Sequence, residues 1–352
     1  MQTTHRIYHG DSGTMDSVAD ESVDLVVTSP PYPMIDMWDE VFIELDPAIG
    51  TALSAGNGPR AYSLMHDRLT ATWREVHRVL VDGGIACINI GDATRTIGGR
   101  FRVYQNHAAI INAFTELGFE PLPDILWRKP TNSVTKFLGS GMIPPNAYAT
   151  LEHEFILVFR KGVSLREFEP GDDRRYESAY FWEERNDWFT DLWTDITGVN
   201  QTLDGTDLRD RSAAFPFVIP YRLINMYSIY GDTVLDPFWG TGTTSIAAMV
   251  TARNSVGYEL DGHFRDHFAE QVSKIPSLSA DVVENRYHQH EAFVADRVDS
   301  GEPPKYVADH YPFRVITAQE TGVRFYEVAD VDAIAETTYV ATHTPYPGTP
   351  SD

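Results

Sequence analysis

Hydrophobic and polar residues follow two patterns along the chain. Short apolar runs rich in β-branched and aromatic side chains predict buried strands at 5–11, 22–29, 84–92, 232–238 and 254–260. Apolar residues that recur every three or four positions predict helices at 70–80, 106–119 and 243–252. Strands separated by helices are typical of an α/β fold with a mostly parallel sheet.

The alternation changes in three places. Two further strands, 124–128 and 153–160, have no convincing helix between them, which predicts an antiparallel pair at the sheet edge. The segment 162–212 lacks a steady period and is rich in Trp, Tyr and Arg, so it is expected to be an inserted module. After about Pro276 the sequence becomes acidic and tyrosine-rich with short β-like runs, and its last residues, from Thr342, are expected to form a loose tail.

Composition limits the class of protein. The 352 residues, 42% of them hydrophobic, are enough for a large core. No apolar run reaches membrane-spanning length, and the first residues lack a signal-peptide pattern, so we expect a cytoplasmic protein with no membrane partner. Cys87 is the single cysteine, which excludes an internal disulfide and a cysteine-based zinc cluster. His153 and Glu154 have no matching histidine, so no metal site is predicted.

The charge of the chain is unusual. Its formal net charge is −23, yet the only lysines are Lys129, Lys136, Lys161, Lys274 and Lys305. Many acids with few lysines are typical of proteins that stay hydrated in multimolar salt, so we interpret the acidity as a halophilic surface. At about 1 M salt the Debye length is only about 3 Å, and such a surface would scarcely repel a polyanion. On composition alone, an acidic protein that never touches nucleic acid is an equal alternative.

A first motif, TSPPY, ends the strand 22–29. Pro30 and Pro31 cannot continue a sheet, because proline donates no ladder hydrogen bond and fixes φ near −65°. The loop therefore presents the Ser29 hydroxyl, a backbone carbonyl and the Tyr32 ring from a stiff backbone.

A second motif, DPFWGTGTT, joins a strand to a helix. Gly240 and Gly242 leave room for a ligand, but no lysine follows as in a P-loop, and Ser245 replaces the third glycine of a dinucleotide fingerprint. A nucleoside-type cofactor without phosphates fits better. Glu259, about 20 residues further on, can accept ribose hydroxyls. A plain tight turn is the alternative, and Asp236 and Glu259 together favour the cofactor site.

In this order the two motifs resemble the β-type amino-methylating DNA methyltransferases, cytosine-N4 subgroup, over most of residues 7–266. The resemblance, with the acidic composition, suggests a haloarchaeal member. It implies a Rossmann-like methyltransferase fold with a mostly parallel seven-stranded sheet, an antiparallel edge strand and a circularly permuted motif order. The implied parts are a catalytic half (1–161), a target-recognition insert (162–212), a cofactor-binding half (213–276) and a C-terminal extension of open role (277–352).

The resemblance also implies roles for single residues. The expected cofactor is S-adenosyl-L-methionine, bound by Asp11, Asp236, Pro237, Phe238, Gly240, Gly242, Thr243 and Glu259. The expected catalytic residues are Ser29, Pro30, Pro31 and Tyr32. The segment 213–224 resembles the part that closes over the methionine end of the cofactor.

The chemistry explains the first motif. An exocyclic base amine is a poor nucleophile because its lone pair is conjugated into the ring. The Ser29 hydroxyl and the Pro30 carbonyl can accept its two N–H bonds and aim the lone pair at the methyl group. Tyr32 can stack on a flipped base. In this family serine favours cytosine N4 and aspartate adenine N6, so adenine is the alternative. Cys87 lies mid-strand and is expected to be inert, which excludes C5 methylation.

A base-flipping enzyme needs cations near its mouth. The candidates lie on loops and in the insert: Arg95, Arg100, Arg102, Arg128, Lys129, Lys136, Arg174, Arg175 and Arg185. Taken singly, each could instead pair with a local acid on a solvated face. The long connection 35–68 could also reach over a duplex.

The leading interpretation is a sequence-specific DNA (cytosine-N4) methyltransferase acting on double-stranded DNA at a short palindrome such as CTAG. The alternatives are adenine-N6 methylation on the same scaffold, a non-catalytic DNA-binding regulator, and an RNA or protein amine methyltransferase. A homodimer and a separate restriction endonuclease are compatible with the sequence. The C-terminal extension could extend DNA contact, mediate dimerisation or cover the sheet edge.

Overall fold

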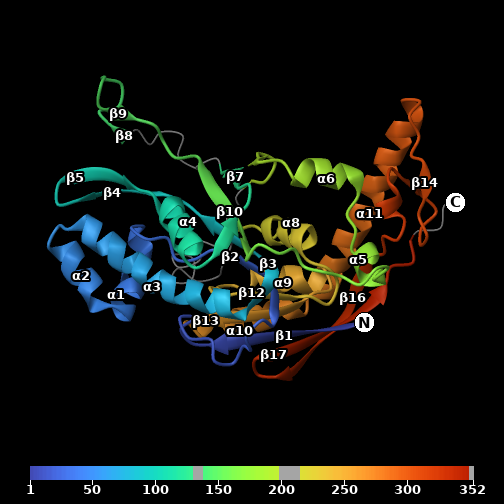
Figure 1. Ribbon diagram of the computed structural model, residues 1–352, viewed down its shortest axis with the longest axis horizontal. Coiled ribbons are helices and arrows are strands. Elements are labelled where there is room, and N and C mark those ends of the chain that lie inside the picture. The colour runs from blue at the N-terminus through green and yellow to red at the C-terminus, as the bar shows by residue number, and fades with distance from the viewer. Residues whose placement is uncertain (130–137, 198–214, 349–352) are drawn as a thin grey trace.

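The computed structural model describes residues 1–129, 138–197 and 215–348 (Figure 1). The strands are β1 (Gln2–His9), β2 (Val23–Thr28), β3 (Leu80–Ile90), β4 (Ala93–Ile97), β5 (Arg100–Tyr104), β6 (Phe119–Pro121), β7 (Ile125–Arg128), β8 (Leu138–Gly139), β9 (Ala147–Tyr148), β10 (His153–Lys161), β11 (Leu192–Trp193), β12 (Thr233–Asp236), β13 (Asn254–Glu259), β14 (Tyr306–Val307), β15 (Arg314–Val315), β16 (Tyr326–Ala335) and β17 (Thr338–Pro345). The α-helices are α1 (Asp39–Leu45), α2 (Pro47–Ser54), α3 (Gly58–Val79), α4 (Asn106–Glu116), α5 (Asp173–Glu177), α6 (Trp182–Trp188), α8 (Val218–Tyr227), α9 (Thr243–Val250), α10 (His263–Val272) and α11 (Ile275–Asp299), with short 3-10 turns at Asp36–Trp38 and Ala318–Glu320.

The centre of the molecule is a mixed sheet in the order β11-β7-β10-β3-β2-β12-β13-β1-β17-β16, with β6 paired to β10. Strands β3, β2, β12, β13 and β1 are parallel neighbours, which confirms the predicted α/β fold. The late strands β7 and β10 form the expected antiparallel pair. That pair is not the sheet edge, because β11 adds beyond β7. Seven of the strands are the expected ones, and β6, β11, β16 and β17 bring the sheet to eleven.

Both faces of the sheet are covered, as a parallel sheet requires. In β2, Val26 packs into one core with residues of α3 and α4, such as Trp73 and Phe114. Its neighbours Leu25 and Val27 point to the other face and pack with α8 and α9. The apolar run 22–29 is continuous for this reason, since alternate side chains enter different cores.

The C-terminal extension differs from its prediction. Residues 275–299 form one long helix, α11, and β17 pairs antiparallel with β1 from Thr338 to Thr342. The expected loose tail is wrong for Thr342–Pro345, which belong to β17. The extension therefore covers the β1 edge of the sheet. Strand β16 pairs with the far side of β17 and is the outermost strand at this end of the sheet.

The described part of the segment 162–212 packs closely on the rest of the molecule. Trp188 and Trp193 are buried in the second core. Glu184 of α6 accepts hydrogen bonds of 2.5 and 2.7 Å from Arg286 of α11. The segment thus lies between the sheet and the extension. Across the described ranges, no helix is both long and apolar enough to cross a membrane.

Candidate active site

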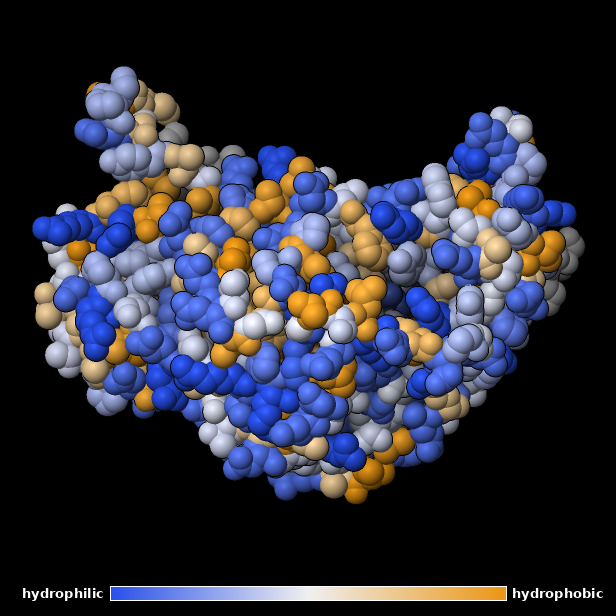
Figure 2. Space-filling view, in the orientation of Figure 1, coloured by the Kyte–Doolittle hydropathy of each residue, from blue (hydrophilic) through white to orange (hydrophobic). Residues whose placement is uncertain are grey.

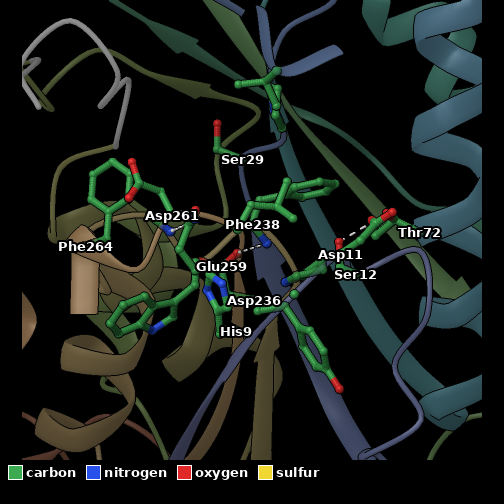
Figure 3. Close-up of a pocket in the computed structure, with 18 of the residues that line it drawn as sticks. His9, Asp11, Ser12, Ser29, Thr72, Asp236, Phe238, Glu259, Asp261 and Phe264 are labelled. Atoms are coloured by element: carbon green, nitrogen blue, oxygen red, sulfur yellow. Dashed lines mark hydrogen bonds between the residues drawn. The ribbon is translucent and has the colours of Figure 1, made fainter. Parts of the chain in front are cut away.

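A cavity of about 800 Å³ opens at the carboxyl ends of the parallel strands (Figure 3). Its wall includes His9 at the end of β1, Ser29 just after β2, Asp236 at the end of β12 and Glu259 at the end of β13. Because parallel strands end at the same edge, motifs that lie more than 200 residues apart meet around one space. This edge is where open α/β sheets bind ligands.

Asp236 joins the two motifs. It is only 3% exposed. Its carboxylate accepts hydrogen bonds from the Thr28 hydroxyl (2.5 Å), the Thr244 hydroxyl (2.6 Å) and the Phe238 amide (3.1 Å). Burial raises its pKa to about 6, and the three donors oppose that rise. Thr28 directly precedes Ser29, so the TSPPY loop is fixed to the glycine turn by this carboxylate.

The two glycines of the second motif serve different purposes. Both have positive φ, +52° at Gly240 and +81° at Gly242. A Cβ on Gly242 would lie 2.5 Å from Phe268 and 2.7 Å from Trp239, so only glycine fits there. A Cβ on Gly240 would meet nothing closer than 3.9 Å, and this residue lines the cavity. Gly240 therefore leaves room for a ligand, while Gly242 permits the close packing beneath it.

Glu259 is held in a fixed orientation beside this turn. Its carboxylate accepts hydrogen bonds from the Gly240 amide (2.7 Å) and the Asp261 amide (2.9 Å). Burial raises its pKa. Each carboxylate oxygen keeps further lone pairs, so the group can accept a pair of ribose hydroxyls without moving.

The rest of the cavity wall suits a nucleoside-type cofactor. Asp11 lies on the wall, held by the Gly13 amide at 2.8 Å. The two arginines on the wall are each paired with a carboxylate, Arg68 with Asp11 and Arg265 with Glu336. No arginine or lysine of the described wall is left unpaired for a pyrophosphate. The predicted cofactor residues that line the cavity are Asp11, Asp236, Pro237, Phe238, Gly240, Thr243 and Glu259, and Gly242 lies behind it.

The predicted catalytic loop, residues 29–32, is only partly on the wall. Ser29 and Pro31 line the cavity, whereas Pro30 and Tyr32 do not. Tyr32 is 9% exposed, and its hydroxyl lies inside a polar network. A role for its ring in stacking on a flipped base stays a prediction.

That network contains two residues that were not predicted from the sequence to belong to the site. Asn89 of β3 and Glu154 of β10 both hydrogen-bond the Tyr32 hydroxyl at 2.8 Å. The available signal was weak: Asn89 is a lone amide in an apolar run, and Glu154 starts a strand. Only the pairing of β10 with β3 brings them together.

The described residues contain no group of three or more His, Cys, Asp or Glu that could hold a metal ion. Cys87 is fully buried in β3, and burial raises the pKa of its thiol, the opposite of what a nucleophilic cysteine needs.

Two of the predicted DNA-binding arginines lie exposed on a hairpin. Arg100 and Arg102 belong to β5, and no carboxylate of the described residues forms an ion pair with either. Phe101, between them, stacks on Tyr148 of β9 with centroids 5.2 Å apart. Figure 1 shows hairpins β4–β5 and β8–β9 together on the side toward which β1 runs, where the parallel strands end. Arg95 differs, because Asp36 and Asp39 hold its guanidinium at 2.6–2.8 Å.

Among the described residues, none of the other candidates lines the cavity. Arg174 and Arg175 lie on α5, near the start of β12 and close to the N-terminus in Figure 1. Arg185 lies over the Phe189 ring. Arg128 is 3.5 Å from Glu152, and Lys129 bonds Glu154 at 2.9 Å. Lys136 lies outside the described residues.

Comparison with known proteins agrees with this geometry. A family model described as DNA methylase matches residues 23–270. The chain is 52% identical to the Type II methyltransferase M.MthZI of Methanothermobacter thermautotrophicus, covering 93% of this chain and 91% of the relative. It is also 52% identical to M.MjaI of Methanocaldococcus jannaschii, covering 77% of this chain and 91% of the relative.

Solved structures show the same fold. TTHA0409 of Thermus thermophilus, solved with S-adenosyl-L-methionine, has a TM-score of 0.60 and 32% identity over 77% of this chain and 94% of its own. The PvuII DNA methyltransferase (cytosine-N4-specific) has a TM-score of 0.51 at 18% identity, over 80% of this chain and 93% of its own, and shares the fold. This chain belongs to the DNA methylase family of N6 and N4 amino methyltransferases, as a Type II DNA methyltransferase that uses S-adenosyl-L-methionine.

Proposed function

We propose that the protein methylates the exocyclic N4 amine of cytosine within a specific DNA site. One observation carries this proposal: the Ser29 hydroxyl lies on the cavity wall, directly after the threonine that is bonded to Asp236 of the cofactor loop. In the family it resembles, serine at this position favours cytosine N4. The same scaffold with adenine N6 as target is the second candidate, because the matched family contains both activities.

The chain's own residues can activate the amine. Bound S-adenosyl-L-methionine supplies an electrophilic methyl group on a sulfonium. The Ser29 hydroxyl on the cavity wall accepts one N–H bond of the flipped base, and the backbone carbonyl of Pro30, a residue that itself lies off the wall, accepts the other. These two bonds favour a pyramidal nitrogen and direct its lone pair into the cavity. Attack by the nitrogen would break the carbon–sulfur bond of the bound cofactor, with the electron pair kept by the sulfur, and the proton that the nitrogen loses would pass to solvent.

The duplex is proposed to lie across the carboxyl edge of the sheet. Arg100 and Arg102 offer cations there for phosphate contact, with no acid of the described chain paired to them. The turn between β8 and β9 exposes Met142 (78%) and Ile143 (70%) at its tip. In Figure 2 a projection rises at the upper left of the molecule, where Figure 1 labels β8 and β9. Apolar side chains on such a projection suit entry between unstacked bases.

The remaining assignments belong to the same proposal. Residues 1–161 and 213–276 are the catalytic and cofactor halves, and the segment 162–212 reads a short palindromic site. A homodimer and a separate endonuclease partner are part of this proposal, as is a halophilic surface.

Nucleoside mass spectrometry tests the proposal. Unmethylated DNA is incubated with the protein and labelled S-adenosyl-L-methionine in concentrated potassium chloride, beside a Ser29→Ala control. We expect label in N4-methylcytosine that the control lacks. Label in N6-methyladenine would reverse the base assignment, and label in neither base from folded, cofactor-saturated protein would reject DNA methylation.

A further inference from the structure

We propose that Glu154 is a positioning residue: acting through Tyr32, it holds the Ser29 hydroxyl as a pure hydrogen-bond acceptor for the target amine. The inference rests on the proposed function, since it explains how Ser29 is prepared for that role. Neither Glu154 nor Tyr32 lines the cavity. The effect of the Tyr32 hydroxyl and of Glu154 on the base therefore passes through Ser29.

The hydrogen bonds of the Tyr32 hydroxyl fix the direction of the chain. A phenol has one proton and two lone pairs. Its proton goes to the Glu154 carboxylate at 2.8 Å, because an ionised carboxylate can only accept. The lone pairs then accept from the Asn89 amide at 2.8 Å and from the Ser29 hydroxyl at 3.2 Å. The Ser29 proton is thus directed at Tyr32, away from the cavity.

This direction decides what Ser29 can offer a ligand. With its proton bonded to Tyr32, the hydroxyl has only lone pairs left for the cavity. It can accept an N–H bond from an amine and has no proton to donate to it. A freely rotating serine would instead present its proton to the amine lone pair for part of the time, which would block attack on the methyl group.

The carboxylate at the end of the chain is itself fixed. Lys129 donates to one oxygen of Glu154 at 2.9 Å, and Asn89 donates to the other at 2.8 Å. The Glu154 side chain is only 12% exposed. With both N–H bonds of its amide used here, Asn89 leaves its carbonyl oxygen buried and without a partner among the described residues.

The test compares single-turnover methyl transfer to DNA by the wild type, Tyr32→Phe, Glu154→Gln and the double variant. Tyr32→Phe removes one hydroxyl and keeps the ring, while Glu154→Gln keeps the shape of the side chain and adds a donor. Glu152→Gln is the matched control, since its side chain is 51% exposed, 3.5 Å from Arg128, and outside the chain of bonds. Calorimetry with S-adenosyl-L-methionine and thermal unfolding accompany each variant.

Each single variant is expected to transfer methyl at least tenfold more slowly, with cofactor affinity within twofold of the wild type. The double variant should be no slower than the slower single one, because both changes break the same chain. Reductions that multiply in the double variant, or a Glu154→Gln rate equal to that of the control, would overturn the inference. If Tyr32→Phe does not fold, Glu154→Gln against Glu152→Gln still decides. A wild type that labels no DNA base overturns the proposed function and this inference together, whereas an active wild type with unaffected variants overturns the inference alone.

Discussion

Two aspartates at the ends of the same short strand are held in opposite ways. Asp232, just before β12, is 5% exposed and bonds the Arg166 guanidinium at 2.6 and 3.0 Å. Asp236, the last residue of β12, is 3% exposed and meets two hydroxyls and one amide. Within the described parts of the chain, no cation forms an ion pair with it.

The difference separates a structural edge from a functional one. A buried carboxylate that is paired with arginine closes the amino edge, where Arg166 also bonds Asp24 at 3.0 Å. A buried carboxylate held only by neutral donors is less stable when ionised, and such groups cluster at functional sites. Strand β12, four residues long, therefore runs from the amino edge, where an arginine stabilises the buried carboxylate, to the carboxyl edge, where the candidate site lies.

The largest expected effect is at the amino edge. Arg166→Met removes the guanidinium that bonds both Asp232, which is buried, and Asp24, whose side chain is 21% exposed, while burial and Asp232 already raise the Asp24 pKa. We expect the free energy of unfolding to fall by about 3–5 kcal/mol, measured by denaturant titration, with methyl transfer by the folded variant unchanged. Arg174→Met, whose side chain is 60% exposed, is the control and should lose under about 0.5 kcal/mol. Equal losses would remove the distinction between these arginines.

Asp236, at the carboxyl edge, should make the free energy of unfolding depend on pH. The pKa of folded Asp236 is about 6, above its ordinary value of 3.8, so the folded state holds this proton more tightly than the unfolded state. This proton therefore adds about 3 kcal/mol to the free energy of unfolding. The contribution is complete below pH 4 and is lost as the pH rises to about 6. Asp236→Asn has no titrating carboxyl here, so its free energy of unfolding relative to that of the wild type should rise between pH 4 and 6 and then level off. Denaturant titrations across pH 4–8 measure it, and a difference independent of pH would contradict the uncompensated burial.

Cofactor binding sharpens the comparison at the same edge. Glu259→Gln keeps the shape of the side chain but removes its charge, so we expect the affinity for S-adenosyl-L-methionine to fall by about 2 kcal/mol, or about thirtyfold. Titration calorimetry measures this. Glu270→Gln, exposed on α10, should bind normally. Unchanged affinity in Glu259→Gln would place the ribose elsewhere.

The smallest effect concerns DNA. Replacing Arg100 and Arg102 with alanine should weaken DNA binding about tenfold at moderate salt and reduce the slope of log affinity against log salt by about 2. The paired change of Arg174 and Arg175, on α5 at the amino edge, should leave the slope unchanged. The opposite result would place the duplex at the amino edge.

The sequence predicted the parts of the fold that depend on local pattern. The strands β2, β3, β12 and β13 are continuous apolar runs because both of their faces are buried. Helix α11 escaped prediction because its buried positions include Ser279 and His290, which interrupt the apolar stripe.

Long-range pairing explains the other differences. The strand β17 pairs with β1 across about 340 residues, and no local signal specifies that partner. Glu154 reaches Tyr32 only because β10 lies beside β3. Arg95 and Arg100 look alike in sequence, yet the fold places acids beside only the first. Composition cannot distinguish such arginines, since the distinction depends on which elements become neighbours.

The bond between Thr28 and Asp236 has a thermodynamic consequence. It joins the loop proposed to meet the base to the loop proposed to meet the cofactor, so a shift of one loop alone would strain this bond. Filling the cofactor side should therefore change the affinity for the target base, and linkage requires that DNA change the cofactor affinity by the same factor. The enzyme's two ligands would then communicate through a single buried carboxylate.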